Sequence, residues 1–146
     1  MRFILLLSFL SFNSVFAQTI LLDEDFSSTT QDGLPDLWSQ YTLSDDGGWL
    51  NGMSNDLQSE WWGIAPHGTF VATNDDACDC NKSEDYLITP PLNFSELDNA
   101  ILSFASFFSG ETFEGSTDLA TIEYSLDGGD SWIVLTEIDG NGNSDN

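Results

Sequence analysis

The clearest regular pattern in the chain is an alternation of apolar and polar residues toward its C-terminal end. Residues 120–126 read Ala-Thr-Ile-Glu-Tyr-Ser-Leu, with an apolar side chain at every second position. This period of two is typical of a half-buried β-strand. Asp-Gly-Gly-Asp follows at 127–130, and residues 132–138 are again mostly apolar. Because glycine readily adopts the positive φ of a tight turn, the pattern predicts a β-hairpin.

Further short segments have the composition of strands, bounded by Gly, Pro, Asn, Asp or Ser, and none shows the apolar period of a helix. They are residues 20–26, 38–43, 61–65, 69–73, 86–89 and 100–109. Together they predict an all-β fold of two packed antiparallel sheets, a β-sandwich. We expect aromatic side chains to supply much of its buried core. These are Phe26, Trp38, Trp49, Trp61, Trp62, Phe70, Phe104, Phe107, Phe108 and Trp132.

The first 17 residues differ from the rest in composition. Arg2 precedes an apolar stretch at 3–12, which is too short to span a membrane, and Val-Phe-Ala follows at 15–17. This arrangement predicts a signal peptide cleaved after Ala17, and therefore a secreted or cell-surface domain at residues 18–146. The alternative is a buried N-terminal strand. Since no second long apolar segment follows, we expect no direct membrane insertion of the mature chain.

Charge narrows the possible partners. The 146 residues contain 25 Asp and Glu against 2 Lys and Arg, a formal net charge of −23. Binding to nucleic acid needs a basic surface that offsets phosphate charge, and so does docking on anionic lipid. Neither class of partner is therefore expected. A carboxylate-rich surface suits calcium, although it is equally the composition of a solvated surface that keeps the protein soluble.

Several motifs occur in an order that resembles a known family. They are Glu-Asp-Phe at 24–26, Leu-Pro followed by Trp at 34–38, Asp-Tyr-Leu-Ile-Thr-Pro-Pro-Leu at 85–92, and Ser-Leu-Asp-Gly-Gly-Asp-Ser-Trp at 125–132. This order resembles the choice-of-anchor J domain, a module of secreted bacterial proteins related to cleaved-adhesin domains and similar to MAM domains. The resemblance implies a two-sheet antiparallel jelly-roll β-sandwich. It also implies a closing strand beyond residue 138, so we expect the domain to be incomplete at its C-terminus.

Three acidic clusters are candidate calcium ligands. Calcium binds six to eight oxygen atoms, usually from carboxylates and carbonyls on loops. The resemblance implies a structural calcium ion and assigns Glu24 as one ligand. Asn74, Asp75 and Asp76 form a second group, which we expect to precede a strand, and Asp118 is a third candidate. The alternative is that all five are ordinary solvated turn residues.

Cys78 and Cys80 are the only cysteines, and His67 is the only histidine. The cysteines form a local disulfide, remain two thiols, or bond to cysteines outside this sequence. One histidine is too few for a typical zinc site. The chain also lacks the Gly-x-Ser-x-Gly and His-Glu-x-x-His patterns of hydrolases. We therefore expect no enzyme activity in this chain.

Trp61 and Trp62 are candidates for stacking against a sugar ring. Adjacent strand residues point to opposite faces, so one of them is expected on the surface, although tryptophan also fills sandwich cores. We expect a non-catalytic adhesion or attachment module of a larger extracellular protein, stabilised by calcium and binding an extracellular protein or glycan. The alternatives are an accessory domain of a secreted hydrolase and a carbohydrate-binding module.

Overall fold

The computed structural model describes residues 19–28, 33–45, 47–59, 63–110, 112–113, 115–140 and 144–145. The expected signal peptide, Trp61 and Trp62 lie outside these ranges. The chain divides into two compact units, Met1–Pro90 and Pro91–Asn146, and each is described by itself. No helix in the described ranges is long and apolar enough to cross a membrane.

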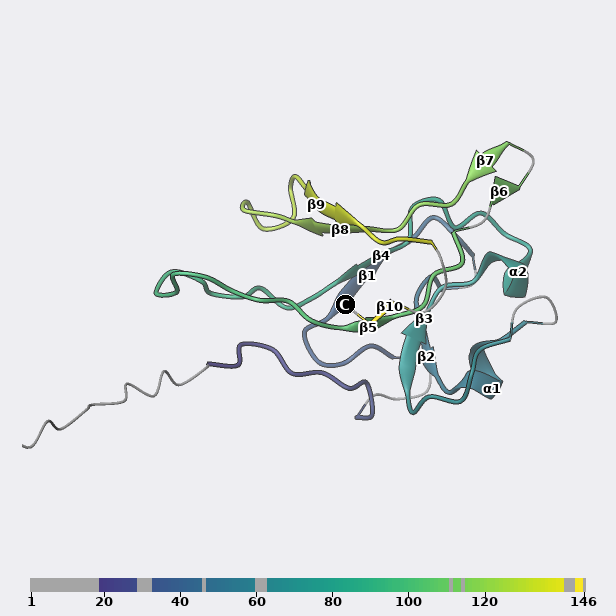
Figure 1. Ribbon diagram of the computed structural model, residues 1–146, viewed down its shortest axis with the longest axis horizontal. Helices are drawn as coiled ribbons and strands as arrows, with labels where there is room; N and C mark the ends of the chain where they lie inside the picture. The colour runs from purple at the N-terminus through teal and green to yellow at the C-terminus, as the bar shows by residue number, and fades with distance from the viewer. Residues whose placement is uncertain are drawn as a thin grey trace, which may run out of the picture. The chain divides into compact units, whose positions relative to one another are not determined.

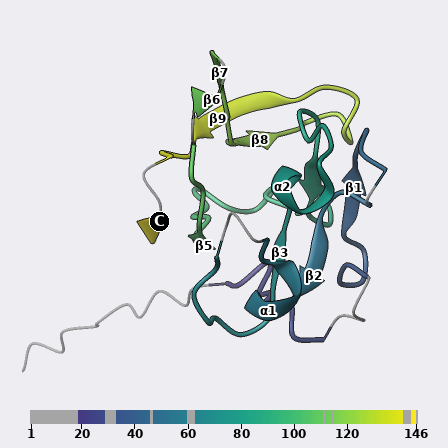
Figure 2. The same cartoon turned by 90° about the vertical axis from the view of Figure 1, so that its right-hand side faces the viewer.

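The first unit contains two antiparallel ribbons. Strand β1 (Ser39–Tyr41) pairs with β4 (Tyr86–Ile88), and β2 (Leu50–Gly52) pairs with β3 (Phe70–Ala72). Figure 2 shows β2 and β3 side by side, with α1 following the end of β2. The β1–β4 pair joins segments more than 40 residues apart, since Ser39 lies opposite Ile88. Non-local pairing of this kind brings the loops around residues 42, 73 and 85 into one region of the unit.

Two one-turn helices interrupt the strands of this unit, and the sequence pattern did not predict them. They are α1 (Ser54–Leu57) and α2 (Asp75–Cys78). At α1, the Asp56 carboxylate accepts a hydrogen bond from the backbone N–H of Met53. At α2, the Asn74 side chain accepts one from the N–H of Ala77. Both contacts satisfy groups at a helix N-terminus, so capping rather than apolar periodicity accounts for these turns.

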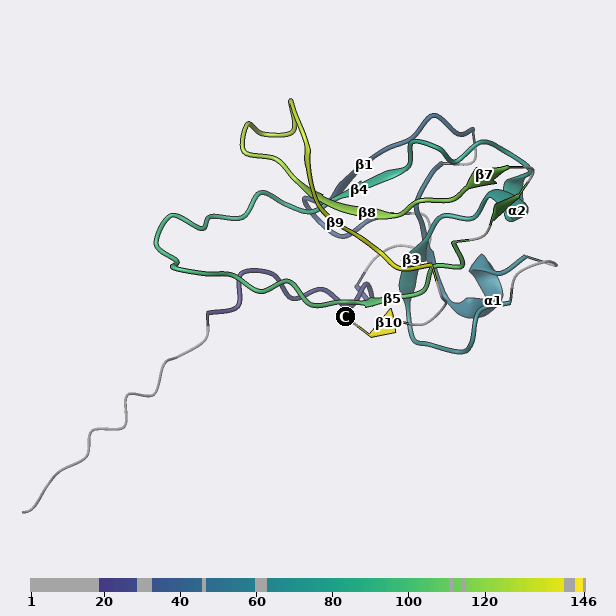
Figure 3. The same cartoon turned by 45° about the horizontal axis from the view of Figure 1, so that its top comes forward.

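The second unit contains three antiparallel pairs, labelled in Figure 1. Strand β5 (Ala105–Ser106) pairs with β10 (Ser144–Asp145), β6 (Thr112–Phe113) pairs with β7 (Ser116–Thr117), and β8 (Thr121–Tyr124) pairs with β9 (Ile133–Glu137). Figure 3 shows β8 and β9 running side by side into the loop that joins them. The predicted hairpin is therefore confirmed, with one register shift between Ile122 and Glu123.

The all-β prediction holds at the level of strands, because strands far outnumber the two short helices. Several predicted strand positions differ from the structure. Residues 20–26 contain no strand, and residues 100–109 contain only the two residues of β5. The described part of 61–65 also contains no strand. All sheets of the described residues are two-stranded pairs.

The expected aromatic core is wrong for the described residues. Leu57, at 8% exposed, is the buried hydrophobic residue among them, while Phe107 and Trp132 are exposed. The other described aromatic residues of that set are half-buried, such as Phe26 and Trp38, whose rings meet edge to face at 5.3 Å. A two-stranded ribbon supplies one neighbouring strand, whereas a ring in a sandwich core is enclosed by two sheets.

Candidate functional site

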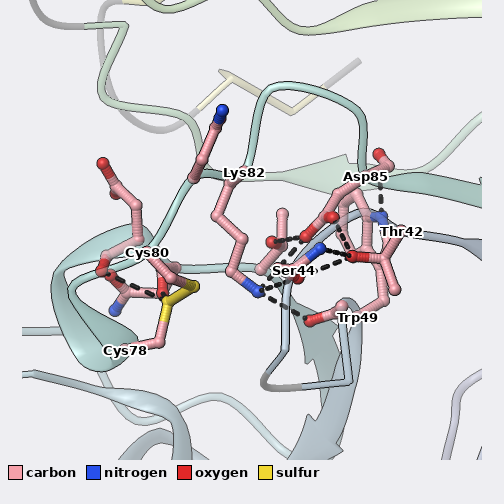
Figure 4. A network of polar contacts seen from close by, with 12 residues as sticks. Thr42, Ser44, Trp49, Cys78, Cys80, Lys82 and Asp85 are labelled. Carbon is pink, nitrogen blue, oxygen red and sulfur yellow. Dashed lines mark hydrogen bonds and ion pairs between the residues drawn. A yellow bond between two sulfur atoms is a disulfide. The ribbon is translucent and has the colours of Figure 1, made fainter.

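A buried carboxylate, Asp85, organises the loops of the first unit (Figure 4). It lies directly before β4, and its side chain is 1% exposed. The hydroxyl of Thr42, which follows β1, donates to Oδ1 at 2.5 Å. The hydroxyl of Thr73, which follows β3, donates to Oδ2 at 2.5 Å. A buried carboxylate is costly unless it is paired and hydrogen-bonded, and Asp85 has both kinds of partner.

Lys82 supplies the opposite charge. Its Nζ lies 3.3 Å from Oδ2 of Asp85, and its side chain is 10% exposed. The same ammonium group donates to the hydroxyl of Ser44 and to the carbonyl of Gly48, both at 3.3 Å. The indole N–H of Trp49 donates to the Asp85 carbonyl at 3.1 Å. The network therefore joins the residues that flank all four strands of the unit.

The Asp85 network holds the loops of the first unit together. Its carboxylate oxygens already accept from two hydroxyls and contact an ammonium group, so they are committed to partners within the chain. In the sequence, Asp85 belongs only to the family-like motif at 85–92, and this motif does not indicate a buried network. A signal was present, because Lys82 is the one basic residue beyond Arg2 and lies three residues from Asp85.

Cys78 and Cys80 form a disulfide beside this network, which is one of the alternatives open from the sequence (Figure 4). Their Cα atoms are 5.2 Å apart, within the usual range for a bridge. Asp79, between them, is the C-cap of α2 and adopts the left-handed conformation, with φ of 53°. Its N–H donates to the carbonyl of Asp75 at 2.8 Å. The cap therefore turns the chain so that the two sulfur atoms meet.

The candidate calcium ligands of the first unit have roles in local structure. Oε1 of Glu24 accepts from the N–H of Phe26 at 2.6 Å. The side-chain oxygen of Asn74 caps α2, and its amide nitrogen lies 3.5 Å from the carbonyl of Leu57. Asp75 and Asp76 are exposed in the first turn of α2. Asn74, Asp75 and Asp76 are thus brought together by the helix turn, and Glu24 belongs to a separate loop.

Asp118 lies in the second unit, on a depression that Glu137 and Asp139 also line. Glu137 was not a candidate from the sequence, because it comes near Asp118 only when β8 and β9 pair. Among the described residues, however, no three His, Cys, Asp or Glu side chains are grouped closely enough to hold one metal ion. The candidate residues, as placed, do not form a complete calcium site, and calcium binding stays a prediction.

Asp127 shapes the loop between β8 and β9. Its carboxylate accepts from the hydroxyl of Ser131 at 2.5 Å, from the N–H of Ser131 at 2.9 Å and from the hydroxyl of Ser125 at 2.7 Å. These hydrogen bonds, that of the Ser131 hydroxyl foremost, lower the pKa of Asp127 to about 2. Ser125 also accepts from the N–H of Gly129 at 2.8 Å. The loop is therefore ordered by its own side chains, next to the exposed Trp132.

His67 is exposed, and its ring centroid lies 6.5 Å from that of Phe70. Trp61 and Trp62 lie outside the described residues, so their proposed contact with sugars stays a prediction.

A scan against protein-family models, a search of curated proteins and a search of solved structures each found no match to this chain.

Proposed function

We propose that the chain is a non-catalytic extracellular attachment module within a larger secreted or cell-surface protein. The observation that carries this proposal is the exposure of β9. Ile133, Val134 and Leu135 are 47%, 54% and 61% exposed, and all five residues of the strand are exposed. Three consecutive residues of β9 therefore expose apolar side chains without a polar residue between them. Contiguous apolar surface of this kind is typical of a protein-interaction site.

The loop before β9 supports the same function. Asp127 and Ser125 hold its backbone through hydrogen bonds, so the loop is ordered without a partner. A binding surface that is already ordered loses less conformational entropy when it binds. Trp132 lies directly before β9 and extends the exposed apolar run toward this loop. The hairpin thus presents an aromatic side chain beside a preorganised polar turn.

The proposed fold is a two-sheet jelly-roll sandwich. Support comes from five antiparallel strand pairs and from the Asp85 network, which contacts residues next to both ribbons of the first unit. Long-range NMR contacts test this part of the proposal. A sandwich requires contacts between side chains of β1–β4 and those of a second sheet, and ribbons without such contacts contradict it.

The proposed module is stabilised by calcium. Support comes from the 25 Asp and Glu residues of the chain, since calcium prefers carboxylate and carbonyl oxygens, and from the family resemblance that implies a structural calcium ion. The proposal concerns stability and assigns calcium no chemical step.

Attachment is testable with a panel of immobilised extracellular-matrix proteins and a glycan array. We expect the full chain to bind at least one member and the double variant Val134→Thr with Leu135→Thr to bind about 10-fold more weakly, because burial of apolar area is lost. Leu97→Thr is the matched control, since Leu97 is also exposed but lies outside the hairpin. No binding to either panel, or equal binding by all variants, contradicts the proposal. Binding that depends on Trp61 or Trp62 instead identifies a carbohydrate-binding module.

A further inference from the structure

The disulfide between Cys78 and Cys80 closes a loop with a single residue between the two cysteines. Disulfides that stabilise a fold usually close long loops, because cross-linking then removes much entropy from the unfolded chain. By thermodynamic linkage, the free energy by which the fold favours the disulfide over the dithiol equals the free energy by which the disulfide stabilises the fold. A disulfide that closes a loop of three residues stabilises the fold only slightly, and the fold in turn favours that disulfide only slightly. The position of this bridge therefore indicates a role other than holding the fold together.

The backbone between the two cysteines is held in a left-handed conformation. Asp79 has φ of 53°, in the region that aspartate adopts less readily than glycine. Its N–H is committed to the Asp75 carbonyl at 2.8 Å. Reduction of the disulfide removes one constraint on this residue. The conformation of Asp79 thus favours the dithiol form relative to a bridge closed through glycine.

The dithiol form has a hydrogen-bond acceptor in place. Sγ of Cys78, which carries no proton in the disulfide, lies 3.4 Å from the Asp75 carbonyl oxygen and 3.7 Å from that of Asn74. After reduction the Cys78 thiol donates to one of these oxygens. In the disulfide the same oxygens lie against the Cys78 sulfur and oppose the approach of a negatively charged thiolate. Cys80 is therefore the sulfur that an incoming thiolate meets.

The surroundings of the bridge define which thiols reach it. Both cysteines are half-buried, and Asp75, Asp76 and Asp79 are exposed within the same five-residue stretch. Lys82 turns its ammonium group to the carboxylate of Asp85, at 3.3 Å (Figure 4). The local charge is therefore negative, so anionic thiols are repelled while neutral and cationic ones are not.

We propose that Cys78 and Cys80 form a redox-active site that oxidises dithiols of neutral or cationic peptides. One substrate thiolate attacks Sγ of Cys80, and the S–S bond breaks. The electron pair passes to Sγ of Cys78, which takes a proton from water as the bond breaks, and the resulting thiol donates to the carbonyl of Asp75 or Asn74. The second substrate thiolate then attacks the substrate sulfur of the mixed disulfide. Cys80 leaves as a thiolate and is protonated. The substrate loses two electrons and two protons, and the protein gains both.

The redox equilibrium of the disulfide tests the proposal first. The full-length chain is equilibrated with dithiothreitol buffers, quenched with acid and alkylated, and its mass is then measured. Relative to structural disulfides, we expect the equilibrium to favour the reduced protein by at least ~100-fold, which is about 60 mV for a two-electron couple. We expect the equilibrium constant to differ between native buffer and urea by about 10-fold, against about 3,000-fold for a loop of a hundred residues. A bridge that is as resistant as a structural disulfide overturns the proposal, as does a chain that keeps two free thiols under oxidation.

Two variants of Asp79 separate the effect of its backbone conformation from the effect of its charge. Asp79→Gly relieves the left-handed conformation, and we expect it to shift the equilibrium toward the disulfide by about 5-fold. Asp79→Asn keeps a side chain that tolerates this conformation but removes the charge. It leaves the equilibrium within about 2-fold and speeds reaction with glutathione by repelling it less. An Asp79→Gly equilibrium identical to that of the unmodified chain contradicts the role of the backbone.

Reaction rates and adduct position test the substrate class and the route. At low salt we expect cysteamine to react faster than mercaptoethanol, and mercaptoethanol faster than glutathione, when rates are compared per thiolate. The spread narrows at high salt because the charges are screened. Peptide mapping after brief exposure to cysteamine finds the adduct on Cys80. Equal rates for the three thiols, or an adduct on Cys78, overturns the assignment. The chain with both cysteines replaced by serine is the control and forms no adduct.

Discussion

At the scale of single residues, Asp85 has an exceptional environment for a carboxylate in so acidic a chain. Its side chain is 1% exposed, and it meets two hydroxyls and the ammonium group of Lys82. Removal of one member of a buried pair leaves the other without compensation, which costs more than the pair itself contributes. The stability of the first unit therefore depends on this one charge.

Replacement of Asp85 by asparagine tests that dependence. We expect Asp85→Asn to lower the free energy of unfolding by about 2–4 kcal/mol, because Lys82 loses its buried counter-charge. Glu84→Gln is the matched control at the neighbouring exposed position, with an expected change within about 0.5 kcal/mol. Urea unfolding followed by tryptophan fluorescence measures both. Equal effects of the two variants would show that the network is dispensable.

Asp127 makes a pH-dependent contribution to stability and, unlike the buried Asp85, lies in an exposed loop. Hydrogen bonds from Ser131 and Ser125 lower its pKa from 3.8 to about 2. A depressed pKa in the folded state means that the stabilisation is complete above pH ~4 and is lost as pH falls from there through 2. We expect the amide resonance of Ser131 to titrate in NMR spectra with a midpoint near pH 2. Asp127→Asn abolishes this transition, whereas Asp130→Asn retains it. A midpoint near pH 4 would contradict the hydrogen-bonding pattern.

At the scale of elements, the turn before β2 depends on a glycine. Gly48 has φ of 76°, and an added Cβ would lie 2.7 Å from the side-chain oxygen of Gln40 and 2.8 Å from Cβ of Thr42. We expect Gly48→Ala to destabilise the chain by about 2–3 kcal/mol through strain and overpacking. Gly68→Ala is the control, because a Cβ there meets nothing within 4 Å. Thermal unfolding of the two variants distinguishes them, and an unchanged Tm for Gly48→Ala is the contrary result.

The elements that the sequence predicts well are those made by neighbouring residues. The β8–β9 hairpin was predictable because alternation and an Asp-Gly-Gly turn lie within one segment. The β1–β4 pair was not, since a strand pattern at 39–41 does not specify a partner at 86–88. The one-turn helix α2 was missed because Asn74 caps it, while it has too few residues for an apolar period.

The same distinction holds for the candidate sites. The Cys78–Cys80 bridge was among the alternatives open from the sequence, because only one residue separates the two cysteines. The Asp85 network was not predictable, because Thr42 and Thr73 reach it only after two separate ribbons have formed. Local spacing therefore predicts turns and local bridges, whereas networks that join distant segments require the fold.

At the scale of the whole molecule, the distribution of charge determines what the surface attracts. Lys82 is the one basic residue beyond Arg2, and its ammonium group is committed to Asp85, Ser44 and Gly48. With 25 Asp and Glu against these two basic residues, the formal net charge of the chain is −23. Self-repulsion of this size destabilises a compact state, so any cation that approaches the carboxylates stabilises the fold.

Calcium and general screening are separable by their magnitude. A site with Kd of about 0.1 mM, at about 10 mM calcium, gains about 2.7 kcal/mol and raises Tm by about 5–10 °C. Magnesium at the same concentration and NaCl at the same ionic strength act mainly by screening, and we expect shifts at least twofold smaller. Differential scanning fluorimetry after EDTA treatment measures all three.

The ligand assignment is tested by variants in each unit. Glu24→Gln and Asp118→Asn each reduce the calcium-specific part of the Tm shift if their carboxylates bind the ion, while Glu96→Gln, at an exposed position outside the three clusters, leaves it unchanged. Loss of the shift in Asp118→Asn alone places the ion at the depression that Glu137 and Asp139 also line. Equal shifts from calcium, magnesium and sodium would instead make the acidic surface an ordinary solvated one. The carboxylates would then keep the protein soluble and bind no structural ion.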